Sequence, residues 1–277
     1  MPRIVVERLG HANVFAESFD DEVGLQREVF GAKVFRTWEN AEVGSRNALA
    51  LIGLTCVETF GSIDPDGPIG RWIAAHGSAW HSIEWTVPSL PEAVEAARAH
   101  GIRITDESPD YAFTHPKDLH GLALELTEHH FEGDDRDTPG FTPAFWADEH
   151  PLGVVGGLTV KVASSGPEKA AADLVALTGE PAYAVERSHL NSVGHGVRFA
   201  DHAVEFTGSA TGVDTDLVGG FVRDHGERIF CVSFTVRDIL AARSHLVASG
   251  VRFEQYGRRS LMLRPTHGAR IELTTLS

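Results

Sequence analysis

The sequence has 277 residues, 42% of them hydrophobic, which is enough chain and enough apolar surface for about two packed domains. It contains 39 Asp and Glu against 24 Lys and Arg, and this acidic balance excludes a protein that binds nucleic acid through clustered basic residues. No apolar run approaches the roughly 18–20 residues of a membrane span, and the first residues, MPRIVVERLGHANVF, lack the pattern of a signal peptide. We therefore expect a cytoplasmic protein that binds neither nucleic acid nor membrane.

Four segments along the chain each predict a strand, then a helix, then a glycine stop. They are HANVFAESFDDEVGLQREVFG (11–31), SIEWTVPSLPEAVEAARAHG (82–101), TVKVASSGPEKAAADLVALTG (159–179) and CVSFTVRDILAARSHLVASG (231–250). In the first and third segments the glycine follows 20 residues after the start, and in the second and fourth it follows 19 residues after the start. The matched intervals predict a repeat within a repeat.

Each segment changes its hydrophobic period where the strand is expected to end. Ile83, Trp85 and Val87 alternate with polar residues, as in a strand, whereas later positions follow helical spacing. Ser89 and Asp238 lie where N-terminal caps belong. Left-handed C-terminal caps are predicted at four glycines: Gly31, Gly101, Gly179 and Gly250.

Every module closes on an apolar strand that carries one acidic residue. The four are Glu58 in CVETF, Glu125 in LALELTE, Glu205 in AVEFTG and Glu272 in RIELTT. A carboxylate among strand hydrophobics is costly to bury unpaired, which makes these residues functional candidates. Residues 131–152, rich in Asp, Gly and Pro, interrupt the periodicity and predict a linker between residues 1–130 and 153–277.

Modules of βαβββ with a histidine near the start of the first strand and a glutamate in the last resemble the vicinal-oxygen-chelate superfamily. This superfamily includes glyoxalase I, methylmalonyl-CoA epimerase, extradiol dioxygenases and bleomycin-resistance proteins. Three stretches are most similar to its epimerase and glyoxalase branches: IGLTCVETF, DPDGPIGRWIAAHGSAWHSIEWTV and FTHPKDLHGLALEL. The resemblance implies an α+β protein with four βαβββ modules, paired into two glyoxalase-like domains.

In that superfamily, paired modules enclose a cavity and contribute one metal ligand from each first strand and one from each last strand. The resemblance therefore implies that His11, Glu58 and Glu125 of the N-terminal domain bind a metal ion. A lone strand histidine or glutamate is more often a satisfied polar residue, but here three such residues fall at the positions that the family uses. We expect one divalent ion, with Mn, Co, Ni, Fe, Zn and Mg as candidates.

The fourth ligand position is ambiguous. Counting back from Val87 and Gly101 places it at Ser82, whereas His81 lies one residue earlier and would point to the opposite face of a regular strand. A β-bulge could turn His81 into the cavity, or water or Glu84 could take the position instead. We favour His81 as the ligand.

Imidazole and carboxylate ligands suit an octahedral divalent ion that leaves adjacent positions for two oxygens of a substrate. Such an ion acts as a Lewis acid toward an enolate-type oxyanion, while a nearby carboxylate moves the proton. The candidate catalytic residues are Glu125, Glu58 and Glu84. We thus expect an epimerase, isomerase or lyase that acts on a small molecule with two vicinal oxygens, and a homodimer is a candidate assembly.

The C-terminal domain lacks both imidazoles of this ligand pattern. Its equivalent positions are Thr159, Glu205, Cys231 and Glu272, which keep both acids. Threonine and cysteine are poor partners in a site for a hard cation. We therefore expect no metal there, and a supporting or substrate-shaping role.

Two other functions remain open. A ring-cleaving dioxygenase would use His11, His81 and Glu125 as an iron-binding facial triad. A non-catalytic binding protein, as in the bleomycin-resistance branch, would keep its ligand after alanine replaces His11 and Glu125. Since fold alone does not determine function, the substrate is left open.

Overall fold

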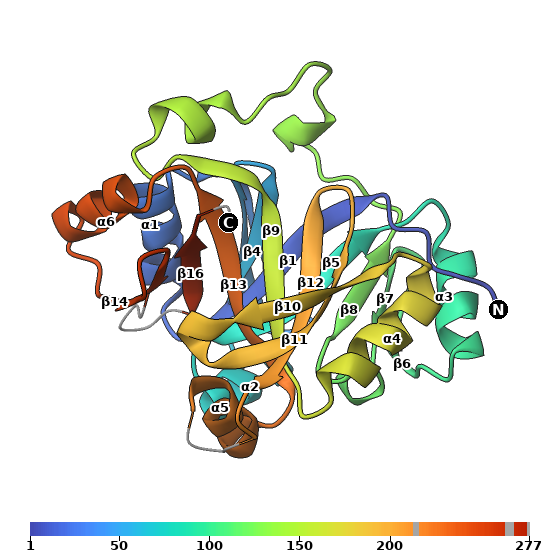
Figure 1. Cartoon of the computed structure of the whole chain (residues 1–277). Coiled ribbons are helices and arrows are strands. Elements are labelled where there is room, and N and C mark those ends of the chain that lie inside the picture. Colours follow the sequence, from blue (N-terminus) through green and yellow to red (C-terminus); the bar gives the residue numbers. More distant parts are fainter. Residues whose placement is uncertain (213–215, 264–268, 276–277) are drawn as a thin grey trace. The chain divides into compact units, whose positions relative to one another are not determined.

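Two eight-stranded mixed sheets form from the repeated strand and helix segments in a computed structural model (Figure 1). The structure describes residues 1–212, 216–263 and 269–275. Both sheets have one pattern of strand order, β2-β3-β4-β1-β5-β8-β7-β6 and β10-β11-β12-β9-β13-β16-β15-β14, so each is built from two consecutive modules. This confirms the α+β class and the four βαβββ modules.

The first sheet comprises the strands β1 (Arg8–Ala16), β2 (Lys33–Asn40), β3 (Ser45–Ile52), β4 (Thr55–Ser62), β5 (Ala79–Thr86), β6 (Ile104–Glu107), β7 (Tyr111–Thr114) and β8 (Leu124–Thr127). Its chain segment also contains the helices α1 (Phe19–Phe30), α2 (Pro68–His76), α3 (Leu90–Ala99) and the 3-10 turn η1 (Pro116–Leu119). Helix α1 packs on β3 and β4, and α3 packs on β6, β7 and β8.

The second sheet comprises the strands β9 (Val154–Ala163), β10 (Ala182–Arg187), β11 (Ser192–Arg198), β12 (His202–Ser209), β13 (Arg228–Val236), β14 (Phe253–Tyr256), β15 (Ser260–Leu263) and β16 (Ile271–Thr274). Its helices are α4 (Pro167–Thr178), α5 (Leu217–His225), α6 (Ile239–Ala248) and the short η4 (Ser188–Leu190). Helices α2 and α5, each between the fourth strand of one module and the first strand of the next, are additions to the predicted elements.

The predicted helix ends are confirmed. Ser89 accepts a hydrogen bond from the backbone of Glu92, and Asp238 accepts one from the backbone of Leu240. The four predicted stop glycines all have positive φ, between 63° and 84°. Gly31 shows why glycine is needed, because its φ of 63° lies in the left-handed region that disfavours a side chain.

The chain forms two compact units, each with segments from both sheets. Unit 1 comprises residues 1–10, 82–130 and 159–230. Within it, His120 Nε2 lies 2.7 Å from Asp173 Oδ2, and the backbone of Ile4 donates to the carbonyl of Leu177 at 2.9 Å. The second and third modules are therefore tied together in this unit.

Unit 2 comprises residues 11–81, 131–158 and 231–277. Inside it, the buried rings of Phe30 and Phe234 lie 5.4 Å apart, and the Trp80 indole donates to the Arg270 carbonyl at 2.8 Å. The first and fourth modules thus share one core. The predicted domains follow the order of the modules along the sequence, whereas the two units are defined by contacts between residues. The domain boundary at residues 131–152 therefore stays a prediction.

The predicted linker contains η2 (Asp135–Asp137) and η3 (Phe145–Glu149) and is attached to the first module. Asp135 pairs with Lys33 at 2.6 Å, and Trp146 donates to the carbonyl of Gly31 at 3.1 Å. Arg136 donates to the carbonyl of Leu54 at 3.3 Å. These contacts hold the segment along unit 2.

Glu22 on α1 is a buried carboxyl, only 2% exposed, and burial raises its pKa from 4.5 to about 7. Because the folded protein binds this proton more tightly than the unfolded chain, its stability should fall as pH rises from about 4.5 to 7 and then level off. We expect Glu22→Gln to be more stable than the wild type at pH 8 by about 3 kcal/mol, and nearly equal to it at pH 4.5.

Chemical denaturation at the two pH values measures this difference. Glu28→Gln, on the exposed side of the same helix, is the matched control and, as a surface substitution, should change the free energy of unfolding by no more than about 0.5 kcal/mol. Equal stability of Glu22→Gln and wild type at pH 8 would contradict the assignment.

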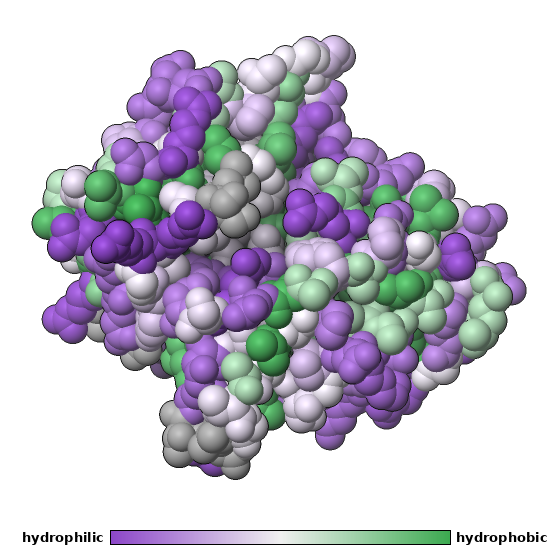
Figure 2. Space-filling model, in the orientation of Figure 1, coloured by the Kyte–Doolittle hydropathy of each residue, from purple (hydrophilic) through white to green (hydrophobic). Residues whose placement is uncertain are grey.

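Among the described residues, no helix is long and apolar enough to cross a membrane. Figure 2 shows hydrophilic side chains over much of the visible face of the molecule.

Candidate metal centre

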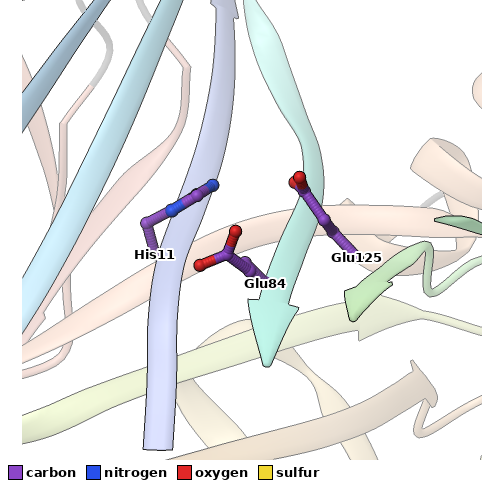
Figure 3. Close-up of side chains that lie close together, drawn as sticks. All are labelled: His11, Glu84 and Glu125. Carbon is purple, nitrogen blue, oxygen red and sulfur yellow. The ribbon is translucent and has the colours of Figure 1, made fainter. Parts of the chain in front are cut away.

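Three potential metal ligands come together in the N-terminal half: His11 on β1, Glu84 on β5 and Glu125 on β8. Each offers a ligand atom within 4.8 Å of the other two. Figure 3 shows the imidazole and the two carboxylates directed toward one another. His11 and Glu84 are buried, at 1% and 2% exposure, and Glu125 is half-buried.

Glu84 and Glu125 are directly opposite each other on the parallel strands β5 and β8. Side chains that pair in this way extend from the same face of a sheet, so the two carboxylates are neighbours. Two like charges in a buried setting raise each other's energy unless a cation or a shared proton compensates them. The donor set thus fits a divalent cation.

Glu58 on β4 approaches His11 from the neighbouring strand. Its Oε2 lies 2.9 Å from His11 Nε2, and both side chains are buried. Two ligands on adjacent corners of an octahedron lie about 3 Å apart when the bonds are about 2.1 Å long. The pair has the spacing of an ion pair, which is also that of two ligands of one ion, but the group of three ligands does not include Glu58.

A buried hydrogen-bond chain holds Glu58 in this position. Asn47 on β3 donates from Nδ2 to Glu58 Oε1 at 2.7 Å, and Ser45 donates from Oγ to Asn47 Oδ1 at 2.6 Å. With one oxygen bound by Asn47, the other oxygen of Glu58 is directed to His11. Sequence reasoning missed Asn47; the signal was its position two residues after Ser45, on the same face of a strand that continues with apolar residues.

We expect Asn47→Ala to weaken metal binding by about 10- to 100-fold, as is typical when a partner that orients a ligand is removed. The carboxylate left behind loses a buried hydrogen bond, so the free energy of unfolding should also fall by about 1–3 kcal/mol. Titration of the purified variant with Co²⁺ measures the affinity. Asn40→Ala, at the end of β2, is the control, and equal affinities of Asn47→Ala and wild type would contradict the orienting role.

A second chain of contacts, entirely within unit 1, holds the strands that carry the ligands. Trp85, next to Glu84, donates its indole N–H to His202 Nε2 at 2.9 Å. His202 Nδ1 donates to Asp201 Oδ1 at 2.8 Å, and the other oxygen of Asp201 accepts from the backbone of Leu9 at 3.0 Å. The third module thereby positions β5 and the start of β1.

Gly10, directly before His11, leaves room for the Glu84 side chain. A Cβ at this position would lie 2.1 Å from Glu84 Oε1 and 3.0 Å from its carboxyl carbon. Any larger residue would therefore displace the carboxylate. The close approach explains a glycine within a strand.

The ring of His81 stacks on Phe15 with centroids 4.4 Å apart and an interplanar angle of 6°. It also meets Trp72 of α2 edge-on at 5.4 Å. The group of three ligands does not include it. The role of His81 as a metal ligand stays a prediction, and Glu84 is the group from β5 that lies beside His11 and Glu125.

In the C-terminal half, the equivalent acids are already bound by protein groups. Glu205 pairs with Arg187 and accepts a hydrogen bond from Tyr183 at 3.1 Å. Burial, followed by the charge of Glu205, raises the pKa of Tyr183, so this phenol stays protonated. Glu272 accepts hydrogen bonds from Ser233 and, at 2.5 Å, from Ser260. These arrangements satisfy both carboxylates without an ion.

The strand order and the paired modules define a class, the vicinal-oxygen-chelate fold. A mutant of 4-hydroxymandelate synthase from Streptomyces coelicolor has a similar structure, with a TM-score of 0.71 over 100% of this chain and 95% of that chain. At 15% identity, this likeness concerns the fold. The fold implied by the resemblance to the vicinal-oxygen-chelate superfamily is thereby confirmed.

Slightly less than half of the chain is similar in sequence to methylmalonyl-CoA epimerases. The mitochondrial methylmalonyl-CoA epimerase of Dictyostelium discoideum is 25% identical over 134 residues, which cover 46% of this chain and 81% of that protein. The Streptomyces coelicolor epimerase solved with 2-nitronate-propionyl-CoA is 26% identical over 44% of this chain and 96% of that chain, with a TM-score of 0.41. No protein-family model matches the sequence.

Proposed function

We propose that the protein is a divalent-metal-dependent enzyme that acts on a small, oxygen-chelating substrate through an enolate-type intermediate, as an epimerase, isomerase or lyase. The observation that carries this proposal is the convergence of His11, Glu84 and Glu125 within 4.8 Å. An imidazole with carboxylates is a donor set for a catalytic divalent ion.

We assign the roles of these residues from their burial and their hydrogen bonds. His11, Glu84 and Glu125 would hold the ion, with Glu58, oriented by Asn47, as a fourth ligand beside His11. Glu125 is half-buried, so it can also exchange protons with solvent, and besides its role as a ligand we assign it the transfer of the proton next to the substrate carbonyl. The ion would supply a positive charge beside the developing oxyanion.

The proposal is supported by the name of a relative, because a methylmalonyl-CoA epimerase is 25% identical to this chain over 134 residues. Methylmalonyl-CoA is therefore the first probe. We expect protein loaded with Co²⁺ to exchange the hydrogen next to the thioester carbonyl for deuterium in D₂O, as followed by NMR. Glu125→Gln should slow the exchange about 100-fold or more while Co²⁺ remains bound.

A panel of 2-oxo acids and other acyl thioesters extends the test to other substrates of this class. Failure of the loaded protein to exchange a carbon-bound hydrogen in any of them would contradict the proposed reaction. A ring-cleaving dioxygenase instead predicts oxygen uptake with catechols by iron-loaded protein. The packing of His81 on Phe15 and Trp72 gives less support to the two-histidine triad of that alternative.

A further inference from the structure

Phe131, the first residue of the linker, lies between the metal-binding histidine and the second strand. Its ring centroid is 5.7 Å from that of His11 and 6.5 Å from that of Trp38 on β2, and the angle between the Phe131 and Trp38 rings is 24°. The linker contacts of Lys33 and Arg136 hold this segment in place. One aromatic ring thus connects the candidate metal centre with β2.

Arg36 also lies against this aromatic ring. Its Cζ is 5.2 Å from the centroid of Trp38 and 5.6 Å from that of Phe131. Stacking on two rings fixes the plane of a guanidinium and leaves its edge N–H groups available to an acceptor. The side chain is exposed, so a ligand can reach it.

The sheet register places Arg36 on the same face as the metal ligands. Arg36 pairs with Leu49, and Leu49 pairs with Glu58, so the three side chains extend from one face of β2, β3 and β4. Trp38 and Asn47 form the next pair on that face, because side chains two residues apart on a strand point to the same side.

Two other arginines of the N-terminal half are engaged by carboxylates. Arg103 forms an ion pair with Asp118 at 2.8 Å, and Arg98 forms one with Glu107 at 2.5 Å. Arg36 is instead held by aromatic rings, which position a positive charge without neutralising it. With a net charge of −15, the protein needs such a local cation to attract an anionic substrate.

We propose that Arg36 binds a carboxylate of the substrate at the end opposite its chelating oxygens, so that the substrate is an oxygen-chelating acid with a second, distal carboxylate. This assignment rests on the proposed metal-dependent function. A guanidinium and a carboxylate are both planar and form two parallel hydrogen bonds, which gives geometric specificity. A phosphate group, as in a CoA thioester, offers similar oxyanion chemistry, and the experiment separates the two.

The test compares 2-oxoadipate with 2-oxohexanoate, which have the same length and the same chelating end but differ in the distal carboxylate. Calorimetry with the Co²⁺-loaded protein should show that 2-oxoadipate binds about 10- to 100-fold more tightly, as a charge-assisted hydrogen-bond pair would produce. Arg36→Gln should remove this preference and leave the affinity for 2-oxohexanoate unchanged.

Arg46→Gln is the matched control variant. Arg46 is also exposed and stacked on a ring, with its Cζ 4.5 Å from the centroid of Phe19, but it alternates with Asn47 and therefore extends from the opposite face of β3. It should keep the full preference for 2-oxoadipate. Thermal unfolding verifies that both variants are folded.

Three results would overturn the proposal: equal affinities of the wild type for the two acids, no binding of either acid, or a preference that survives Arg36→Gln. Weaker binding of free CoA to Arg36→Gln without a preference for 2-oxoadipate would assign Arg36 to a phosphate instead. If the preference depends on Arg36 but no carbon-bound hydrogen exchanges in any probe, the proposed reaction fails and the carboxylate site stands.

Discussion

His11→Ala should abolish stoichiometric binding of Co²⁺ or Mn²⁺ and, with it, all metal-dependent hydrogen exchange. His11 contributes the imidazole of the group formed with Glu84 and Glu125. Without it, the two adjacent carboxylates bind the ion with lower affinity. We expect the affinity to fall by more than about 100-fold, since removal of an outer partner alone typically costs 10- to 100-fold. Metal analysis after equilibrium dialysis measures the change.

Two further histidine variants make this result specific. His81→Ala should reduce the affinity much less, because the His81 ring packs on Phe15 and Trp72. His100→Ala is the control, since this half-buried histidine at the end of α3 bonds to the carbonyl of Pro2. The ligand set would be contradicted if His11→Ala bound metal as well as the wild type. It would also be contradicted if His81→Ala were the one variant of the three to lose metal binding completely.

Trp85→Ala should lower the free energy of unfolding by about 3–5 kcal/mol, the usual cost of removing a buried tryptophan. Trp85 has no exposed surface, packs on Phe199 with ring centroids 5.1 Å apart, and donates to His202. Because it follows Glu84 directly, the cavity would also loosen that ligand, so Co²⁺ should bind more weakly. Denaturant titration and metal titration of the same variant test both effects.

Trp85→Phe separates packing from hydrogen bonding. This variant keeps an aromatic ring in the core and loses the hydrogen bond to His202. We expect its free energy of unfolding to fall by about 1 kcal/mol. Stability of Trp85→Ala within 1 kcal/mol of the wild type would show that the third module does not support β5. A normal stability with lost metal affinity would instead indicate a direct effect on Glu84.

The modules were predictable because their signals are local. The change of period after Val87, the cap at Ser89 and the positive φ at Gly101 depend on neighbours within one helix. Helices α2 and α5 were not predicted: Pro68 and Gly70 in the first, and Gly219 and Gly220 in the second, are typical of loops.

The site was harder to predict because it depends on strand register. Ser82, His81 and Glu84 lie within four positions of one strand, and only pairing with β8 shows that Glu84 faces Glu125. Phe131 and Arg36 were missed for a similar reason. They meet across almost a hundred residues of chain, and no repeat or spacing signals that contact.

The most direct measurement is an anomalous difference map at the cobalt edge from crystals grown with Co²⁺. We expect one strong peak in each molecule, within bonding distance of His11, Glu84 and Glu125, and none beside Glu205 or Glu272. A peak bound by other residues, or no peak among these three at saturating cobalt, would contradict the metal centre on which the proposed function depends.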